Sequence, residues 1–214
     1  MKTIDKSYWE KNYSEPETMD GIGNSREHAQ YLKAFLALEH EHITTMVDFG
    51  CGYGHLFKTM IKTFIPHYAV GIEPSEFAFK KAKRLKLKPV ESSEVYLYQK
   101  NLLDWCLSKK REPVFDLGIC TSVFQYIPDK DLKLILPILA KKVKLLYLTV
   151  PTNEEFKRQG KELNFVDEYA IHRTRERYQT LMKPHFTCIS ARIFESKVHY
   201  NEKNTAFSDL LFRY

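Results

Sequence analysis

The chain has 214 residues, of which 43% are hydrophobic and 28% are charged, and its formal net charge at pH 7 is +6. A chain of this length and apolar content can fill one α/β core, so we expect a single domain over residues 1–214. No apolar run approaches the roughly 20 residues of a membrane-spanning helix, and the first residues lack the apolar stretch of a secretory signal. These features exclude a membrane-embedded protein and favour a cytoplasmic one.

The four cysteines are widely spaced and form no C-x-x-C pair; they are Cys51, Cys106, Cys120 and Cys188. Metal sites and disulfide frameworks usually show closely spaced ligands. We therefore expect four reduced, buried thiols, as is typical of a cytoplasmic protein, and no metal site.

The most informative segment runs from Val47 to Gly54 and reads Val-Asp-Phe-Gly-Cys-Gly-Tyr-Gly. An apolar, strand-like run ends in an acid, and glycines then occupy every second position. Because glycine has no Cβ, such a turn allows a ligand to approach the backbone closely. Helical spacing follows from His55 onward, so the turn opens onto a helix N-terminus with free N–H groups. The third glycine comes one residue too early for the dinucleotide-binding pattern G-x-G-x-x-G.

An acid followed by G-x-G-x-G resembles motif I of the class I S-adenosylmethionine-dependent methyltransferases, and this resemblance implies S-adenosylmethionine as the cofactor. A second acid, Glu73, stands about 20 residues further on, at the end of the next predicted strand. This position suits an acceptor of hydrogen bonds from ribose hydroxyls, and Glu73-Pro74-Ser75 resembles the ribose-binding element of the family. An acid here also favours the start of the following helix, and both roles are compatible.

The resemblance also implies contacts to adenine after the third predicted strand. Relatives usually carry an Asp there, whereas this chain has Asn101, followed by Leu102 with its backbone N–H. The Asn side chain keeps an acceptor oxygen for the adenine amino group. Asp104 is the competing candidate for the same contact.

Two residues are candidates for a direct part in catalysis. Tyr126 follows the fourth predicted strand, where relatives often carry His, and is interpreted either as a pocket wall or as part of the core. His172 is a candidate general base because the pKa of His lies near neutrality; a surface or structural His is the alternative. The predicted cofactor-binding residues are Tyr13, Asp48, Gly50, Cys51, Gly52, Gly54, Glu73, Pro74, Asn101, Leu102 and Thr121.

The order of the predicted elements indicates the fold. Strands are expected to end near Asp48 and to cover residues 68–72, 95–99, 115–120 and 144–150, with a final antiparallel pair from 186–194 and 206–214; helices are expected over 25–41, 75–87 and 129–142. Strands that alternate with helices imply a parallel sheet with helices on both faces. We therefore predict a Rossmann-like, doubly wound, mostly parallel seven-stranded sheet with an antiparallel C-terminal strand.

Two regions lie outside this core and are expected to select the substrate. Residues 1–40 resemble the lid of similar enzymes, and the aromatic rings of residues 8–13, Tyr13 among them, can attract a sulfonium cation or simply pack on the sheet edge. Residues 152–184 resemble a substrate cap. Thr174 is expected to cap a helix that ends before Pro184.

The methyl acceptor is expected to be a small molecule. The Asn/Asp-Pro-Pro-aromatic motif of base-amino methyltransferases is missing after the fourth predicted strand, as is the paired-glutamate loop of protein arginine methyltransferases. RNA or protein acceptors stay open, because the basic run over residues 80–88 can track phosphates as well as form a solvated helical face. Two further classes stay open: a domain that binds the cofactor without catalysis, and a nicotinamide oxidoreductase.

Overall fold

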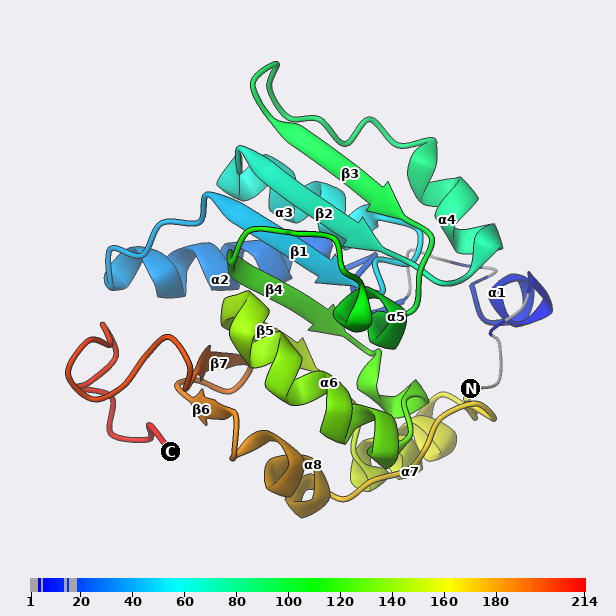
Figure 1. The fold of residues 1–214 in the computed structure, drawn as a ribbon. Helices are drawn as coiled ribbons and strands as arrows, with labels where there is room; N and C mark the ends of the chain where they lie inside the picture. The colour runs from blue at the N-terminus through cyan, green and yellow to red at the C-terminus, as the bar shows by residue number, and fades with distance from the viewer. Residues whose placement is uncertain (1–3, 5, 14, 16–18) are drawn as a thin grey trace.

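Seven strands form one sheet in the computed structural model, which describes residues 4, 6–13, 15 and 19–214. The strands lie in the order β3-β2-β1-β4-β5-β7-β6, and Figure 1 shows them side by side. Their bounds are β1 Thr45–Phe49, β2 Tyr68–Ile72, β3 Glu94–Tyr98, β4 Phe115–Thr121, β5 Val143–Thr149, β6 Phe186–Cys188 and β7 Ile193–Ser196. Strand β7 is antiparallel to its neighbours β5 and β6, and the first five strands pair in parallel. The predicted fold class is confirmed.

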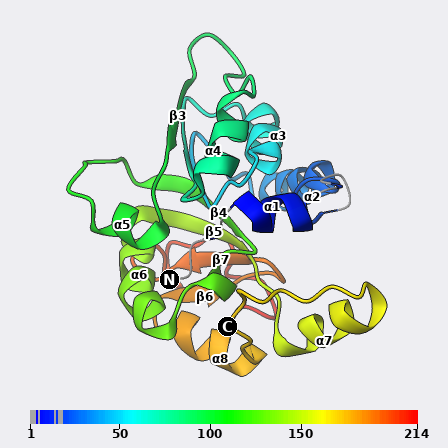
Figure 2. The same ribbon diagram turned by 90° about the vertical axis from the view of Figure 1, so that its right-hand side faces the viewer.

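Helices cover both faces of the sheet, and the views in Figures 1 and 2 agree on these layers. The helices are α1 Lys6–Asn12, α2 Ser25–Leu38, α3 His55–Phe64, α4 Glu76–Lys83, α5 Leu102–Leu107, α6 Asp129–Lys142, α7 Asn153–Glu162 and α8 Arg175–Met182. Helices α2 and α3 pack on one face and α5, α6 and α8 on the other. Because successive side chains of a strand point to opposite faces, Val47 and Phe49 join the core on the α5–α6 side, whereas Met46 joins the core under α2 and α3.

Several local signals place the helix ends where the chain leaves the sheet. Ser75 caps α4 by accepting a hydrogen bond from the backbone of Ala78, and Thr174 caps α8 in the same way through Arg177. Such caps satisfy backbone donors that a helix start leaves free. The capping role predicted for Thr174 is confirmed, while the helix expected over 75–87 is shorter and ends at Lys83.

The prediction of a strand over residues 206–214 is wrong. The final antiparallel pair is formed by β6 and β7 alone, and residues 206–214, all of them described, form turns and irregular backbone. Phe207 is buried and stacks on Phe35, but Leu211 and Phe212 are 87% and 76% exposed. The alternation of apolar residues therefore does not match alternating burial here. Two backbone hydrogen bonds between Cys188 and Tyr214, and an ion pair between Arg213 and Glu195 of β7, hold the segment beside β6 and β7.

No helix in the described part of the chain is long and apolar enough to cross a membrane. Within the same residues no three His, Cys, Asp or Glu side chains gather as metal ligands would.

Candidate active site

A cavity of about 300 Å³ lies at the carboxyl ends of β1, β2 and β4. Ligands of doubly wound sheets bind at this edge, because the loops that follow parallel strands meet there. Helix α1 and residues 20–22 close its other side, and Figure 2 shows α1 next to α4 at this edge. Eleven predicted site residues line it: Tyr13, Asp48, Gly50, Cys51, Gly52, Glu73, Pro74, Asn101, Leu102, Thr121 and Tyr126.

The glycine turn forms the floor of this cavity. The three glycines have φ angles of 81°, 54° and 83° at Gly50, Gly52 and Gly54, a region that side chains with a Cβ rarely adopt. The backbone N–H groups of Gly50 and Cys51 donate to the carbonyl of Ile72, at 2.8 and 2.9 Å, which fixes the turn against β2. The turn is thus held by its neighbouring strand before any ligand arrives.

Gly54 does not line the cavity. It is the residue before α3, and a Cβ there would lie 3.2 Å from Ala82 and from Leu85. The structure therefore places Gly54 where α3 begins and where α4 packs close to the turn.

Glu73 directly follows β2, and its carboxylate points back to the glycine turn. One oxygen accepts from the backbone N–H of Gly52 at 2.9 Å, and the other accepts from that of Ser75 at 2.8 Å. Burial raises the pKa of Glu73 to about 7, although both hydrogen bonds act to lower it. An acid so placed has further lone pairs for hydroxyl donors of a ligand.

Asp48 is the buried acid of the site and is only 1% exposed. Its Oδ1 has no hydrogen-bond partner among the described residues. Burial, with a further contribution from Glu73, raises the pKa of Asp48 to about 8. A buried carboxylate oxygen without a partner is costly, so a ligand with a cationic or donating group would stabilise it. An acceptor oxygen in this place therefore fits the donating amino group of an amino-acid cofactor.

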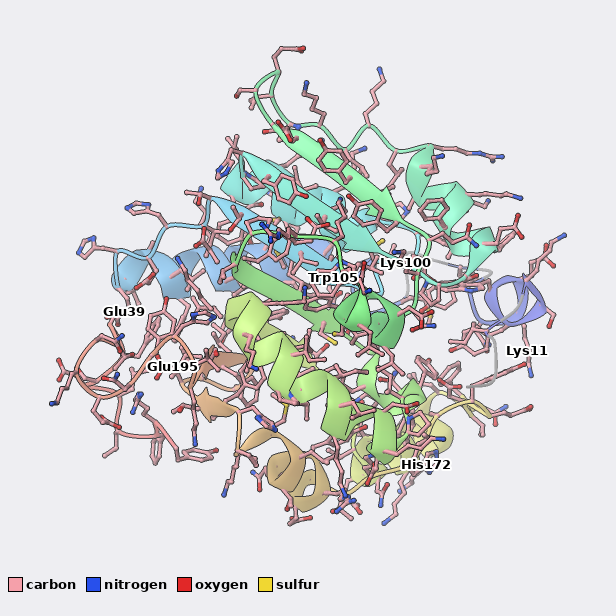
Figure 3. All side chains as sticks on the ribbon, viewed as in Figure 1. Lys11, Glu39, Lys100, Trp105, His172 and Glu195 are labelled. Atoms are coloured by element: carbon pink, nitrogen blue, oxygen red, sulfur yellow. The ribbon has the colours of Figure 1, made fainter. Side chains whose placement is uncertain are left out.

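Of the two residues predicted as alternatives for the adenine contact, Asn101 lines the cavity and Asp104 does not; Leu102 lines it as well. The side-chain oxygen of Asn101 accepts from the backbone N–H of Asp104 at 2.8 Å, and its amide donates to the Asp104 carboxylate at 2.7 Å. Asn101 thus caps the N-terminus of α5. Because it lines the cavity and Asp104 does not, its position favours Asn101 over Asp104 for the predicted contact with adenine. Lys100, labelled in Figure 3, lines the same edge.

Aromatic rings from α1 face the glycine turn. Trp9 stacks on Tyr53 at 5.0 Å between ring centroids and lies 4.6 Å from Tyr13. A Cβ on Gly52 would lie 3.5 Å from the Trp9 ring. The Trp9 indole nitrogen is buried without a hydrogen-bond partner in the described residues, and burial raises the pKa of Tyr13. These rings line the cavity, and aromatic rings there suit a cationic ligand.

Tyr126 belongs to a network that the sequence did not indicate. Its hydroxyl donates to Asp167 at 2.6 Å, the hydroxyl of Tyr8 donates to the same oxygen at 3.2 Å, and the two hydroxyls are 2.8 Å apart. Burial is the main cause that raises the pKa of Tyr126 and Tyr8, so both phenols keep their protons. The network joins α1, the turn after β4 and the segment after β5 at the edge of the cavity.

His172 lies apart from this network and does not line the cavity. It is exposed, and its ring stacks on Phe156 of α7 at 4.3 Å; Figure 3 labels it. The next residue, Arg173, is buried and donates to the carboxylate of Asp129 at 2.6 Å and to the carbonyl of Phe124 at 3.0 Å. Arg173 therefore supports the turn that carries Tyr126, whereas His172 remains a predicted catalytic residue without a contact to the cavity.

Asp20 and Ser122 also line the cavity, although no sequence motif singles them out. Asp20 accepts a 3.0 Å hydrogen bond from His28, and Ser122 has a φ of 54°, unusual for a residue with a Cβ. A positive φ is visible only in the backbone, so no pattern in the sequence would have found Ser122.

The sheet order, the acid–glycine turn after β1 and the acid at the end of β2 define the class of S-adenosylmethionine-dependent methyltransferases. A family model described as a methyltransferase domain matches residues 40–201, so the chain belongs to this family and is an S-adenosylmethionine-dependent methyltransferase. No curated protein sequence matches significantly.

Solved structures of methyltransferases share the fold at low sequence identity. The plantazolicin methyltransferase BpumL, in complex with a monoazolic desmethylPZN analog and SAH, gives a TM-score of 0.66 at 16% identity over 96% of this chain and 80% of BpumL. An S-adenosylmethionine-dependent methyltransferase from Clostridium acetobutylicum ATCC 824 gives 0.59 at 11% over 78% of this chain and 90% of that one. The small RNA methyltransferase HEN1 gives 0.57 at 18% over 81% of this chain and 25% of that one. These likenesses show the fold.

Proposed function

We propose that the protein transfers the methyl group of S-adenosylmethionine to a small-molecule acceptor. The observation that carries this proposal is the cover over the cofactor cavity: Trp9 lies close above Gly52, and Tyr8 and Tyr126 share Asp167 at the cavity edge. A covered site admits a small molecule more readily than a duplex or a folded protein. The BpumL structures contain azole substrate analogs, which is consistent with this class of acceptor.

In this proposal each part of the cavity binds one part of the cofactor. Glu73 accepts hydrogen bonds from the ribose, Asp48 pairs with the amino group, and Asn101 with Leu102 borders adenine. The bare backbone of Gly50 and Gly52 lies beside the ligand, with Cys51, Pro74 and Thr121 around it. The rings of Trp9 and Tyr13 stabilise positive charge.

The cofactor supplies a methyl group that its sulfonium already activates. The protein must then hold the acceptor in line, and positioning of this kind is worth about 7–11 kcal/mol in favourable systems. We assign this positioning to Tyr126, Tyr8 and Asp167, whose hydroxyls and carboxylate can orient a polar acceptor. His172 acts as a base only if the segment around it approaches the cavity.

The same proposal divides a single domain of residues 1–214 into a core, a lid and a cap. Residues 1–40 act as the lid and residues 152–184 as the substrate cap, and the contact between Tyr8 and Asp167 joins the two. We also propose a cytoplasmic location, supported by four free cysteines.

Transfer of a labelled methyl group tests the proposal. The protein is incubated with methyl-labelled S-adenosylmethionine and, separately, with the small-molecule, RNA and protein fractions of a cell extract. We expect the label to appear in the small-molecule fraction. An Asp48→Asn variant should not transfer it. Label confined to RNA or protein would contradict the acceptor class, and cofactor binding without transfer to any fraction would indicate a domain that binds without catalysis.

A further inference from the structure

A second, larger groove of about 1020 Å³ lies beyond the carboxyl end of β5. Its walls come from the segment 148–152, from α7 and α8, from the hairpin of β6 and β7, and from residues 210–212 and 214. Figures 1 and 2 both show α8 below the sheet beside β6. The groove is large enough for a ligand at the upper end of the usual range of pocket volumes.

The groove and the cofactor cavity meet. Asp20 and Ser122 line both of them. The left-handed φ of Ser122 turns the chain at this junction, where its backbone N–H donates to the carbonyl of Thr149 at 2.8 Å. Strained backbone of this kind is concentrated at functional sites. A molecule in the groove can therefore reach the cofactor cavity at this junction.

The lining of the groove combines an apolar body with cationic groups. Leucine, valine, methionine and phenylalanine side chains form much of the wall, and the charged residues are Arg158, Arg175, Lys183 and Arg192 against Asp20 and Glu155. Thr149 lines the groove, and its hydroxyl is buried without a hydrogen-bond partner in the described residues. Buried polar groups of this kind are normally satisfied, which suggests a polar ligand atom.

Most of the cationic charge is free to meet a ligand. Within the described chain, Arg175, Lys183 and Arg192 form no salt bridge, and Arg158 pairs only with Glu155 in an exposed contact at 2.9 Å. Exposed pairs contribute little, so Arg158 can exchange its partner. Arg192 donates to the hydroxyl of Tyr147 at 3.3 Å, which holds its guanidinium in place, and Asp20 balances part of its charge.

From this charge and shape we infer that the groove binds the methyl acceptor, an elongated molecule with an apolar body and an anionic head group, whose other end reaches the cofactor at Ser122. This inference rests on the proposed function and adds the acceptor's chemistry. Guanidinium groups bind carboxylates and phosphates in a fork-like geometry, so either head group fits.

Binding of matched ten-carbon probes tests the inference. Decanoate, decyl phosphate, decanol and decylamine are titrated calorimetrically into the protein saturated with S-adenosylhomocysteine. Decanoate or decyl phosphate should bind at least about tenfold more tightly than decanol, and decylamine most weakly. The tighter of the two anions identifies the head group. Equal binding of all four probes, or no binding of either anion, would overturn the inference.

Two double variants locate the binding site. Arg158→Gln/Arg175→Gln removes two exposed cations that line the groove, and Lys157→Gln/Lys161→Gln removes two exposed cations of α7 that do not. The first should weaken binding of the anionic probe about tenfold and lower methyl transfer to the small-molecule fraction, whereas the second should leave both unchanged. Equal loss in both would show non-specific attraction and overturn the inference.

The affinity for S-adenosylhomocysteine is measured on the same preparations. This measurement separates the proposed function from the assignment of the groove to the acceptor. If the protein binds S-adenosylhomocysteine but not the anionic probe, only the groove assignment is wrong. A protein that binds no S-adenosylhomocysteine contradicts the proposed function itself. If the Arg158→Gln/Arg175→Gln variant has a lower melting temperature than the parent protein, the single variant Arg175→Gln replaces it in the binding test. Arg175 is exposed at the start of α8.

Discussion

The hydroxyl of Tyr126 donates a 2.6 Å hydrogen bond to the carboxylate of Asp167, which stands 41 residues further along the chain. Tyr8 reaches the same oxygen from helix α1, so one carboxylate joins three separate segments at the edge of the cofactor cavity. The arrangement both closes the cavity and leaves polar oxygens at its rim. It therefore couples the position of helix α1, part of the proposed lid, to the position of the groups that would hold an acceptor.

Replacement of Tyr126 by Phe should test this coupling. The variant loses the hydrogen bond to Asp167 and the contact with the Tyr8 hydroxyl, which should cost about 1–2 kcal/mol of unfolding free energy, since Asp167 keeps its contacts with Tyr8 and with the backbone of Tyr169. If Tyr126 positions the acceptor, kcat should fall about three- to tenfold while the KM for S-adenosylmethionine changes little. Tyr31→Phe, which removes an exposed contact with Ser190, is the matched control. An unchanged kcat would limit Tyr126 to a structural role.

Glu73→Gln should weaken cofactor binding. The amide keeps the shape of the side chain but loses the charge and places a donor against the backbone N–H of Gly52 or of Ser75. Because hydrogen bonds to charged groups are worth about 1.5–3 kcal/mol, the affinity for S-adenosylhomocysteine should fall about 10- to 100-fold by calorimetry. Glu76→Gln, on the exposed start of α4, should leave it unchanged. Similar affinities for both variants would argue against a ribose contact at Glu73.

The pKa values of Asp48 and Glu73 predict how stability depends on pH. Both are raised in the folded protein, to about 8 and about 7, above their ordinary values near 4. The folded state therefore binds more protons than the unfolded one, and this contribution to stability is full below pH 4 and is lost as the pH rises to about 8.

Asp48→Asn should remove the contribution of Asp48 to this dependence. The difference in unfolding free energy between the parent protein and the variant should change by on the order of 4 kcal/mol between pH 5 and pH 8, in the direction that disfavours the parent at high pH. Denaturant unfolding at a series of pH values measures it. Parallel curves for the two proteins would show that Asp48 titrates normally.

Gly50→Ala should destabilise the protein, because its φ is 81° and a Cβ there would lie 2.6 Å from a methyl group of Val123. Strain and overlap together should cost about 1–3 kcal/mol. Adding Val123→Ala should recover only the part due to overlap. Gly160→Ala is the control, since that helical position is open and Ala should stabilise it by about 0.5–1 kcal/mol. Equal effects at both glycines would contradict the predicted strain in the turn.

The sheet was predictable because its evidence is local. Each parallel strand is a short apolar run that ends at a polar or small residue, as at Asp48 and Glu73, and the helix between two strands is long enough for a right-handed crossover. Apolar and polar residues also alternate in the segment 206–214, but its apolar side chains are not buried at every second position as they would be in a strand. Phe207 is buried in the core there and Leu210 packs against it, whereas Leu211 and Phe212 are exposed.

Only the glycine turn and the acids near the strand ends could be predicted from the sequence. Glycine spacing and an acid at a strand end are visible in the sequence, whereas the contact between Tyr8 and Asp167 joins residues 159 positions apart. His172 was nominated for its chemistry, but chemistry does not show which way a side chain faces. In the structure its ring stacks on Phe156, away from the cavity, so its role as a general base stays a prediction.

Calorimetric titration with S-adenosylhomocysteine, alongside NADH, tests the central assignment most directly. The cavity beneath Trp9 should bind S-adenosylhomocysteine at micromolar or tighter concentration, and Asp48→Asn should abolish or strongly weaken the heat, while NADH should give none. Saturable binding of NADH together with no heat from S-adenosylhomocysteine would contradict the assignment of Asp48, the glycine turn and Glu73 to an S-adenosylmethionine site.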